Sequence, residues 1–482
     1  MNNNTKTSFY LITDAHFVSK KIWVEGEPIN GRERGDQIAL KASPEILDAF
    51  LKKIIADTET DTVIFTGDNV NGGDMISHYD FRERLERLKA AGKKVYVTTA
   101  THDYCSPNNE DECFQKNAVR YTETGTEPVD MMLRSGLFDF YADYGPNQAL
   151  SVHKESGSYT VKISDGVRLI MINDNGNGRS HCGLFEDGVK WLTAEIDAAN
   201  EAGDFVLLAV HHPVISPFEV YRHLVDFEMF GGYRELSELM CEKNVRVVFT
   251  GHTHVQNIRE YKSEKGGSFY DVSTIALVNA AGKMRKVDID TASGECSIDS
   301  IGIETLDGVD TGGETVYKHL YHLNFPGALE TLIPLANENY DVFLVKARGV
   351  LPVDFFKKHR LIGKWAFRKL SKMKMKFLMR FGRTKKLLTP AQAEQIKNES
   401  LIHVVYEILR CIFPGNAPYT PDTAENIVLS GVARRLDRIV KRFKIKKVEG
   451  LIPPGSSLEE MAQDFLYNDR TGDDNKIVIN LR

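Results

Sequence analysis

The sequence is poor in cysteine, in long apolar runs and in excess charge of either sign. Its 482 residues contain six cysteines, and no two of them form a CxxC pair. Scattered cysteines are typical of thiols in a reducing compartment and argue against a disulfide framework. No stretch reaches the roughly 18 uncharged apolar residues of a membrane-spanning helix. The formal net charge of -6 argues against a generic nucleic-acid binder, so we expect no specific nucleic-acid binding.

The first residues, MNNNTKTSFYLITDAHF, also lack the basic and then apolar stretches of a secretory signal peptide. We therefore expect a cytoplasmic protein. Apolar residues make up 42% and charged residues 27%, the balance of a soluble globular protein. The chain is too long for one ordinary core, which indicates two or three domains. The oligomeric state stays open.

Short β-rich runs alternate with helical patterns through about the first 260 residues. The predicted strands are SFYLIT, DTVIFT, KKVYVTT, GDFVLLAV and VRVVFT. The predicted helices lie in SPEILDAFLKKIIADT, DFRERLERLKAAG, EDGVKWLTAEIDAANEAG and YRELSELMCEKN. This alternation predicts the α/β class, and consecutive strands at 148–172 and 256–300 add antiparallel pairs, giving mixed sheets.

A stretch rich in Gly, Thr and acid at 303–315 marks a domain boundary, and the pattern beyond it is mainly helical. We therefore predict one domain over residues 1–303 and a mainly helical C-terminal domain over 316–482.

Five of the predicted strands are followed, within three residues, by aspartate or histidine. These ends read Asp14-Ala15-His16, Gly67-Asp68, His102-Asp103, His211-His212-Pro213 and Gly251-His252-Thr253-His254. In an α/β sheet, groups distant in sequence converge at the carboxyl ends of the strands. The chain has only 14 histidines, so five such endings are difficult to ascribe to ordinary polar residues that close strands at turns.

The side chains at these ends are carboxylates and imidazoles without thiolates. This set suits Mn, Fe or Zn in a reactive site rather than structural zinc. Two neighbouring ions need a bridging anion, and the single aspartate after Gly67 suits that role. Gly67 and Gly251 permit tight turns that bring backbone and ligands close together. The sequence therefore predicts a site for two divalent or trivalent metal ions.

Taken in order, the five motifs resemble the signature of the calcineurin-like metallophosphoesterase superfamily. The resemblance covers about residues 7–300 and depends on the ordered set, because DxH and GD are weak motifs alone. It implies a four-layer α/β/β/α sandwich of two mixed sheets, in agreement with the alternation above. It also implies a metal-dependent hydrolase with a phosphate-ester substrate, and the motifs leave monoester, diester and pyrophosphate substrates open.

Carried over position by position, the resemblance implies two metal sites and a catalytic pair. The ligands of the first ion would be Asp14, His16, Asp68 and His254. The ligands of the second ion would be Asp68, His211 and His252, with Asp68 as the bridge. His102 would contact the phosphoryl oxygen and the leaving group, and Asp103 would orient its imidazole.

The implied reaction is in-line attack of a metal-bridging hydroxide on phosphorus. Two ions about 3.5–4 Å apart lower the pKa of a shared water and clamp the phosphoryl oxygens. The charge that develops in the transition state is met by the metals and by His102. Protonation of the leaving group by His102 would add general acid catalysis, typically worth about 10²–10⁴-fold.

The chain departs from the family pattern just before His102. The family has Gly-Asn-His there, and the asparagine oxygen completes the second metal site, whereas this chain has Ala100-Thr101-His102. A hydroxyl is a poorer neutral ligand than an amide oxygen. The second site is therefore weaker, is completed by water, or uses another oxygen such as that of Asn69 or Asn71. Thr101 also keeps open a different class of function, a metal-poor pseudo-enzyme that acts as a binding or membrane-associated scaffold.

Other polar residues near the motifs are assigned plainer roles. The family spacing to Pro213 selects His211, so we expect His212 to be solvated or to support a ligand. We expect His223 to have a structural role. The residues that form a polar surface loop, with substrate contact as the alternative, are Asn175, Arg179 and His181.

Residues 357–386 contain 13 Lys or Arg and no acid, in a chain that is acidic overall. The apolar residues that recur there at helical spacing are Ile362, Ala366, Leu370, Met373, Phe377 and Phe381. We favour a helix that packs this stripe on the protein and leaves its basic face in solvent. The alternatives are a helix on an anionic membrane surface and a basic wall that steers an anionic substrate. A second basic run at 433–447 supports both alternatives.

Overall fold

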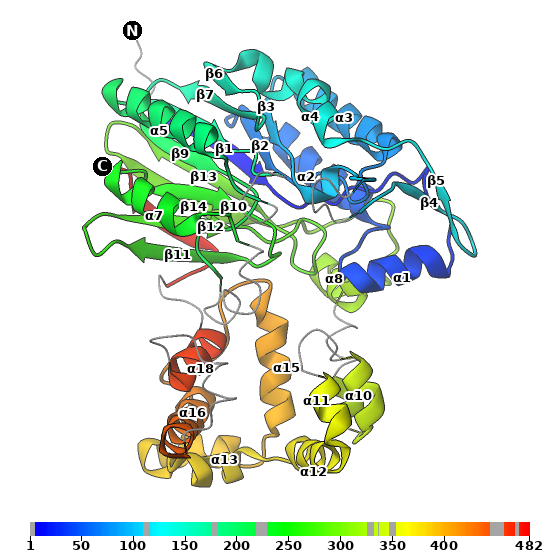
Figure 1. Ribbon diagram of the computed structural model, residues 1–482, viewed down its shortest axis with the longest axis vertical. Coiled ribbons are helices and arrows are strands. Elements are labelled where there is room, and N and C mark those ends of the chain that lie inside the picture. The colour runs from blue at the N-terminus through cyan, green and yellow to red at the C-terminus, as the bar shows by residue number, and fades with distance from the viewer. Residues whose placement is uncertain are drawn as a thin grey trace. The chain divides into compact units, whose positions relative to one another are not determined.

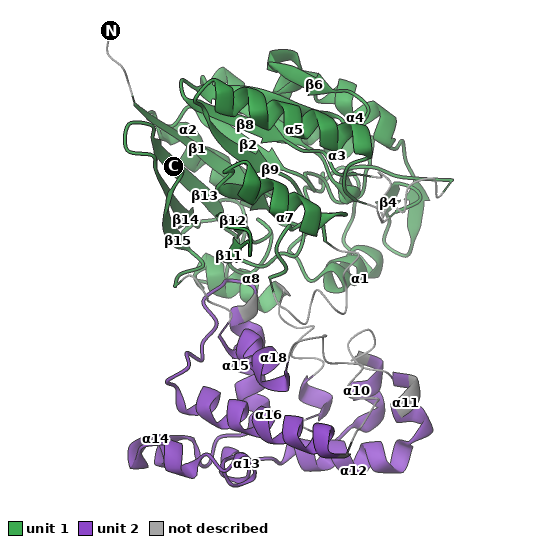
Figure 2. Cartoon of the chain, turned by 60° about the vertical axis from the view of Figure 1, so that its left-hand side comes forward, with its two compact units in different colours: residues 1–217, 225–324, 471–482 green, residues 218–224, 325–470 purple. Residues whose placement is uncertain are grey.

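The computed structural model describes residues 5–108, 115–175, 182–217, 229–324, 332–335, 337–346, 353–443, 457–467 and 472–482 (Figure 1). The chain divides into two compact units (Figure 2). Unit 1 comprises residues 1–217, 225–324 and 471–482, and unit 2 comprises 218–224 and 325–470. Unit 1 therefore includes the last twelve residues, which the sequence pattern groups with the helical segment 316–482.

Unit 1 contains two mixed sheets. The first has the order β15-β14-β13-β1-β2-β3, with the parallel strands β1, β2 and β3 at one side. The second has the order β11-β12-β10-β9-β8-β7-β6, with parallel pairing from β8 to β12 through β9 and β10. The remaining pairs are antiparallel, which confirms the predicted mixed sheets.

The strands of the first sheet are β1 (Lys6–Ile12), β2 (Thr62–Thr66), β3 (Lys94–Thr98), β13 (Met284–Asp290), β14 (Glu295–Ile301) and β15 (Lys476–Asn480). Those of the second sheet are β6 (Ser151–His153), β7 (Ser158–Ser164), β8 (Val167–Met171), β9 (Phe205–Ala209), β10 (Val247–Thr250), β11 (Asn257–Lys262) and β12 (Ser268–Ser273). A separate hairpin is formed by β4 (Val119–Tyr121) and β5 (Thr126–Pro128).

Successive residues of each strand point into different cores, because side chains alternate across a sheet. In β1, Phe9 packs between the two sheets, whereas Tyr10 packs in the core beneath α2 and α3. In β9, Leu207 packs between the sheets, and Leu208 packs beneath α5 and α7. The structure is thus the predicted α/β/β/α sandwich. Its covering helices are α2 (Ser43–Ala56), α3 (Met75–Ala90), α5 (Glu186–Glu201) and α7 (Tyr233–Glu242).

Shorter helices of unit 1 surround the sandwich. They are α1 (Glu27–Asp36), α4 (Arg134–Phe140) and α8 (Val316–Asn324).

The final strand, β15, closes the first sheet beside β14. Its Ile479 lies opposite Cys296, and both side chains are buried between the sheets. Just before the strand, a carboxylate oxygen of Asp474 accepts hydrogen bonds from the backbone N–H of Ile258 and the side-chain amide of Asn257, each at 3.1 Å. The sequence pattern does not reveal this strand, because its pairing partner lies about 180 residues earlier in the chain.

The described part of unit 2 is helical, as predicted. Its helices are α10 (Tyr340–Lys346), α11 (Val353–Lys358), α12 (Arg360–Ser371), α13 (Met375–Gly382), α14 (Pro390–Ile396), α15 (Leu401–Ile412), α16 (Ala424–Phe443) and α18 (Leu458–Leu466). The core that joins α13 to α15, α16 and α18 includes Met375, Val404, Val428 and Leu466. No helix among the described residues of the whole chain combines the length and apolarity needed to cross a bilayer.

The basic segment 357–386 does not form the single helix that its apolar spacing predicts. The helix is interrupted between α12 and α13. There the backbone N–H of Met375 donates to Glu399 O, and that of Leu401 donates to Met373 O, both at 3.0 Å. This break resets the helical phase. Ile362 is 67% exposed and Phe377 is 51% exposed, so the predicted stripe is buried only in part, at Leu370 and Met373.

Candidate metal centre

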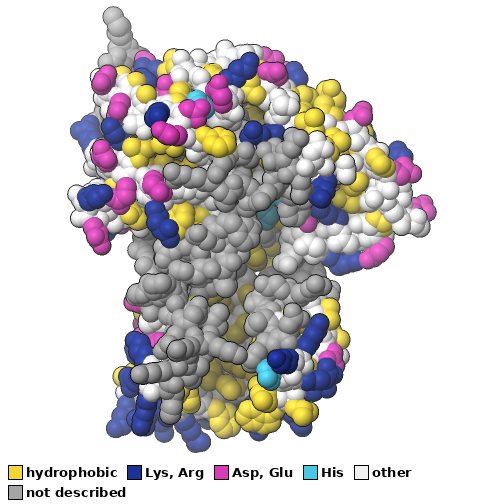
Figure 3. All heavy atoms as spheres, viewed as in Figure 1, with side chains coloured by type: hydrophobic (Ala, Val, Ile, Leu, Met, Phe, Trp, Pro, Cys, Tyr) yellow, Lys and Arg dark blue, Asp and Glu magenta, His cyan; other side chains and the backbone are white. Residues whose placement is uncertain are grey.

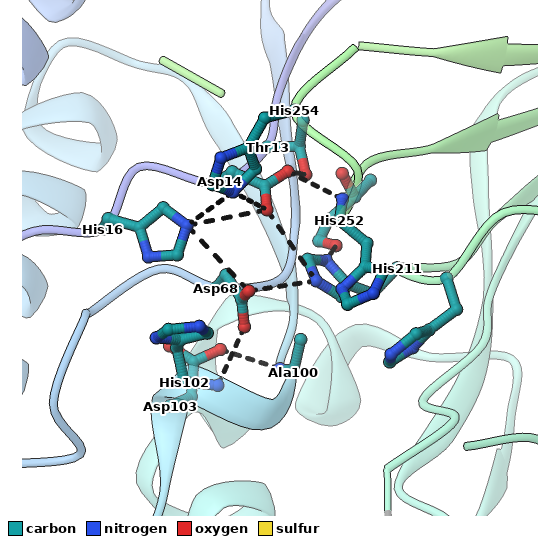
Figure 4. Close-up of polar contacts among 12 residues, drawn as sticks. Thr13, Asp14, His16, Asp68, Ala100, His102, Asp103, His211, His252 and His254 are labelled. Atoms are coloured by element: carbon teal, nitrogen blue, oxygen red, sulfur yellow. Dashed lines mark hydrogen bonds and ion pairs between the residues drawn. The ribbon is translucent and has the colours of Figure 1, made fainter. Parts of the chain in front are cut away.

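The five predicted strand ends meet at the carboxyl edges of the two sheets (Figure 4). Asp14 and His16 follow β1, Asp68 follows β2, and a short 3-10 helix over Thr101–Asp103 follows β3. From the second sheet, the residues that follow β9 and β10 are His211, His252 and His254. Two sheets thus contribute to one site, which parallel pairing around β1 and around β9 makes possible.

Three groups of side chains bring their ligand atoms within 4.8 Å of one another. They are Asp14–His16–His254, His16–Asp68–His102 and Asp68–His211–His252. Asp68 belongs to two groups, and its Oδ2 lies 3.1 Å from His211 Nε2 and 4.0 Å from His16 Nε2. Asp68 therefore lies between two sets of imidazoles, in the position that a bridging ligand needs.

The backbone at this site is strained. Asp14, His16, Asp68, His252 and His254 all have positive φ angles, between 39° and 65°. Non-glycine residues rarely adopt this conformation, and each instance costs of order 1–3 kcal/mol. Five of the ten such residues in the described chain are therefore concentrated at the predicted ligands. The neighbouring contacts force the conformation, which aims each side chain into the centre.

Two glycines allow this close approach. Gly67 has a φ of 102°, and a Cβ there would lie 2.8 Å from His211 Nδ1. At Gly251 a Cβ would overlap Thr13 Oγ1 and Asp14 Oδ2. Only glycine fits either position without displacing a predicted ligand.

Hydrogen bonds to the outer ring nitrogens orient the imidazoles. The Nδ1 of His211 lies 3.0 Å from Thr66 O, and the Nδ1 of His16 lies 2.9 Å from Asn71 Oδ1. Carbonyl oxygens only accept, so each Nδ1 carries the hydrogen, and Nε2 points inward. Metal-binding histidines are held in this way in proteins.

The inner ring nitrogens crowd together. The Nε2 atoms of His16 and His254 lie 3.0 Å apart, and His254 Nε2 lies 3.4 Å from Asp14 Oδ1. Asp14 Oδ1 and His211 Nε2 are buried and have no hydrogen-bond partner in the described structure. Such buried polar atoms are costly unless a cation or a proton joins them. The donor set and its orientation therefore fit metal ions.

The charges at the site are strongly coupled. Burial opposes ionisation of Asp14 and Asp68, but the positive charge of His211 outweighs it and holds the pKa of both carboxyls below the usual range. Burial also lowers the pKa of His211, and the carboxylates of Asp68 and Asp14 outweigh burial and raise it to about 10. The two carboxylates thus create a strong preference for positive charge between them.

His102 lies beside this centre. Its backbone N–H donates to Asp68 Oδ1 at 2.9 Å, and its Nδ1 lies 3.1 Å from the carbonyl oxygen of Asn71. Asn71 thus orients two imidazoles, because its side chain holds His16 and its backbone holds His102. Burial lowers the pKa of His102, while the charge of Asp68 partly offsets this effect.

The resemblance implies that Asp103 orients the ring of His102, but the carboxylate of Asp103 has other partners. Its carboxylate accepts the backbone N–H groups of Val70 at 2.9 Å and Ala100 at 2.8 Å, and the side-chain amide of Asn69 at 3.2 Å. Burial and the charge of Asp68 raise the pKa of Asp103 to about 8. Asp103 therefore links the loops that carry Asp68 and His102. The ring of His102 is oriented instead by the carbonyl of Asn71.

Thr101 is buried at the start of the 3-10 helix, next to His102. Of the two oxygens suggested as substitutes for the family's asparagine, Asn71 Oδ1 is engaged elsewhere, 2.9 Å from His16 Nδ1. Asn69 is held through its amide nitrogen, which donates to Thr98 O at 2.9 Å.

His212 and Asp174 form a buried pair behind the centre. His212 Nδ1 lies 3.0 Å from Asp174 Oδ2, and the His212 ring packs 4.2 Å from the ring of His252. His212 is therefore buried rather than solvated, and it supports a predicted ligand. The sequence prediction does not include Asp174, although this residue follows β8 as the other aspartates follow their strands.

The polar loop predicted near residue 175 is only partly described. Asn175 is buried, and its side-chain amide donates to Thr99 O at 2.8 Å, so it links two loops. Residues 179, 181 and 223 lie outside the described residues.

Comparison with known proteins agrees with the motif pattern. The sequence model of the calcineurin-like phosphoesterase family matches residues 7–256. No curated protein matches the chain.

Solved structures that resemble the chain include a dimetal phosphatase from Danio rerio, with 11% identity, a TM-score of 0.43, and coverage of 61% of this chain and 96% of that one. A purple acid phosphatase from yellow lupin has 13% identity and a TM-score of 0.40, with coverage of 63% of this chain and 53% of that one. With TM-scores this low, these structures carry no argument about function, which depends on the family match and the geometry of the centre.

Proposed function

The chain belongs to the calcineurin-like phosphoesterase family, and from this premise we propose that it hydrolyses phosphate mono- or diesters at a centre of two metal ions. Membership in the family makes it a metal-dependent phosphoesterase. The number of ions, the role of each residue and the ester type are the proposal. The metals would be Mn, Fe or Zn, because the donors are carboxylates and imidazoles.

One observation carries the proposal. The imidazoles of His16 and His211 bond acceptor oxygens through Nδ1, which leaves each Nε2 facing a buried carboxylate. An ion pair between His211 and Asp68, at 3.1 Å, accounts for only one of these contacts, because Asp14 Oδ1 lies 3.8 Å from His211 Nε2. Here two nitrogens and two carboxylates meet with unpartnered atoms at Asp14 Oδ1 and His211 Nε2, which is the arrangement that cations complete.

Each ion would have its own ligands and share one. The first would be held by Asp14, His16, Asp68 and His254. The second would be held by Asp68, His211 and His252, and Thr101 occupies the position where the family places a further ligand. When bound, such ions supply a water of lowered pKa and neutralise charge on the phosphoryl oxygens.

His102 would serve as the general acid. Its Nδ1 is held by the carbonyl of Asn71, so Nε2 is the atom that carries the proton for the leaving group. Burial makes the protonated ring a stronger acid, and Asp68 keeps part of the positive charge in place. Asp103 would act through position, because its bonds to Val70 N and Ala100 N fix the loop before His102.

A substrate panel with metal analysis tests the proposal. The purified protein is assayed with added Mn on an aryl monoester, a bis-aryl diester, a cyclic nucleotide and a nucleoside diphosphate derivative. We expect turnover of a monoester or a diester and about two metal ions per chain, a count that follows from the two ligand sets. A protein with neither bound metal nor turnover would instead be the metal-poor scaffold that Thr101 left open.

A further inference from the structure

Helix α12 exposes large apolar side chains on the side opposite to its core. Gly363, Phe367 and Leu370 face inward, and the rings of Phe367 and Phe343 lie 4.8 Å apart. On the other side, Leu361 is 85% exposed and Trp365 is 64% exposed, one helical turn apart. Such residues normally mark a contact surface when they cluster.

Helix α13 repeats the arrangement. Met375, Leu378 and Met379 fill the core of unit 2, whereas Phe377 and Phe381 point outward. The apolar face that a helix needs for folding is therefore already satisfied in α13. The outer ring of Phe377 is 51% exposed and contributes nothing to that core, whereas the guanidinium of Arg435 lies 4.8 Å from the centre of the Phe381 ring.

Cations are interleaved with these apolar side chains. The Lys and Arg residues on α12, α13 and the turn after them that form no ion pair with a described carboxylate are Lys364, Lys369, Lys374, Lys376, Arg380, Arg383, Lys385 and Lys386. Figure 3 shows hydrophobic and basic side chains side by side over the part of unit 2 where Figure 1 labels α12 and α13. The surface is at once apolar and strongly positive.

We propose that the outer faces of α12 and α13 bind the surface of an anionic lipid bilayer. Leu361, Ile362, Trp365 and Phe377 would enter the boundary between head groups and acyl chains, and the lysines and arginines would contact lipid phosphates. Tryptophan is enriched at this depth, and long basic side chains reach back toward the head groups. Both helices are too short to cross the bilayer, so they lie in its plane.

Charge and apolarity together favour a bilayer over other partners. A nucleic acid would use the cations and stack on aromatic rings, but it offers no site for the aliphatic side chains of Leu361 and Ile362. A second copy of this chain, packed through the same face, would place like charge against like charge. Only an anionic bilayer presents negative charge above a continuous apolar layer.

The test measures binding of the full chain to vesicles of phosphatidylcholine alone and with 30% phosphatidylglycerol. We expect tighter binding to the anionic vesicles by tenfold or more, and a blue shift of Trp365 fluorescence that is absent in Trp365→Phe. Lys369→Gln/Lys376→Gln should weaken anionic binding about 25-fold, at about fivefold for each lost charge.

A second pair of variants separates insertion from charge attraction. Leu361→Ser/Trp365→Ser should weaken anionic binding at least tenfold, because two apolar side chains leave the bilayer. The matched control is Tyr79→Ser/Leu150→Ser, which alters residues of unit 1 that are 59% and 58% exposed and should leave binding unchanged. All four sites are exposed, so circular dichroism should report intact folding.

Three results would overturn the proposal. The first is equal binding to neutral and anionic vesicles. The second is anionic binding that survives Leu361→Ser/Trp365→Ser, which would indicate charge attraction alone. The third is a dimer or an RNA complex that the same variants abolish while vesicle binding persists, which would identify the surface with that partner.

Discussion

Replacement of Asp68 by asparagine tests the bridging role directly. The substitution keeps the size of the side chain and an oxygen for the backbone N–H of His102, which now donates to Asp68 Oδ1 at 2.9 Å. What it removes is the negative charge between His16 and His211. The fold should therefore persist while metal binding fails.

The structure sets the size of the effect. Asp68 Oδ2 lies 3.1 Å from His211 Nε2. At an effective dielectric constant of about 20, a pair of unit charges at this separation interacts by about 5 kcal/mol. That energy corresponds to about 10³–10⁴ in a binding constant, and a divalent ion would lose at least as much. We expect kcat/KM to fall by about 10³ or more, because the lost charge supports the transition state too.

Elemental analysis after gel filtration, combined with turnover of a bis-aryl phosphate in Mn, measures both effects. The wild-type protein should retain about two ions and the Asp68→Asn variant one or none, as expected for a shared ligand. Asp204→Asn is the matched control, because Asp204 is also buried and lies 2.8 Å from Arg168 Nη2 before the start of β9, away from the centre. Full metal content and normal turnover in Asp68→Asn would refute the bridging role.

Three further predictions concern other features of unit 1. His102→Ala should slow hydrolysis of esters with poor leaving groups by about 10²–10⁴-fold and that of nitrophenyl esters far less, whereas an equal loss on both would remove the acid role. Burial lowers the pKa of His78 to about 4, so this residue's contribution to stability is complete above pH 6.5 and is lost as the pH falls toward 4. Urea unfolding should show about 3 kcal/mol of that loss, and His78→Gln should not show it. Gly251→Ala should cost about 1–3 kcal/mol and weaken metal binding, because the new Cβ meets Asp14 Oδ2, whereas Gly35→Ala, in open space on α1, should reduce neither stability nor metal binding.

Most residues of the predicted metal centre can be identified from the sequence, because the pattern that marks them is local. Each predicted ligand follows a short apolar run, and strand propensity decides where such runs end. Asp14, Asp68 and His254 could therefore be named without coordinates. The same rule applied to β8 would have found Asp174. The positive φ angles of Asp14 and His16 could not be predicted from the sequence, because contacts with distant segments impose them.

Partners across long sequence separations were decided only by the tertiary structure. Asp103 bonds the backbone of Val70 rather than the His102 ring, and β15 joins β14 of unit 1. The spacing in residues 357–386 predicts one continuous helical stripe, but the helix is interrupted before Met375, and Phe377 is exposed. Residue type and spacing determine which side chains are able to act and roughly where each strand ends. Which groups meet depends on packing among distant segments, whose small energy differences no local pattern contains.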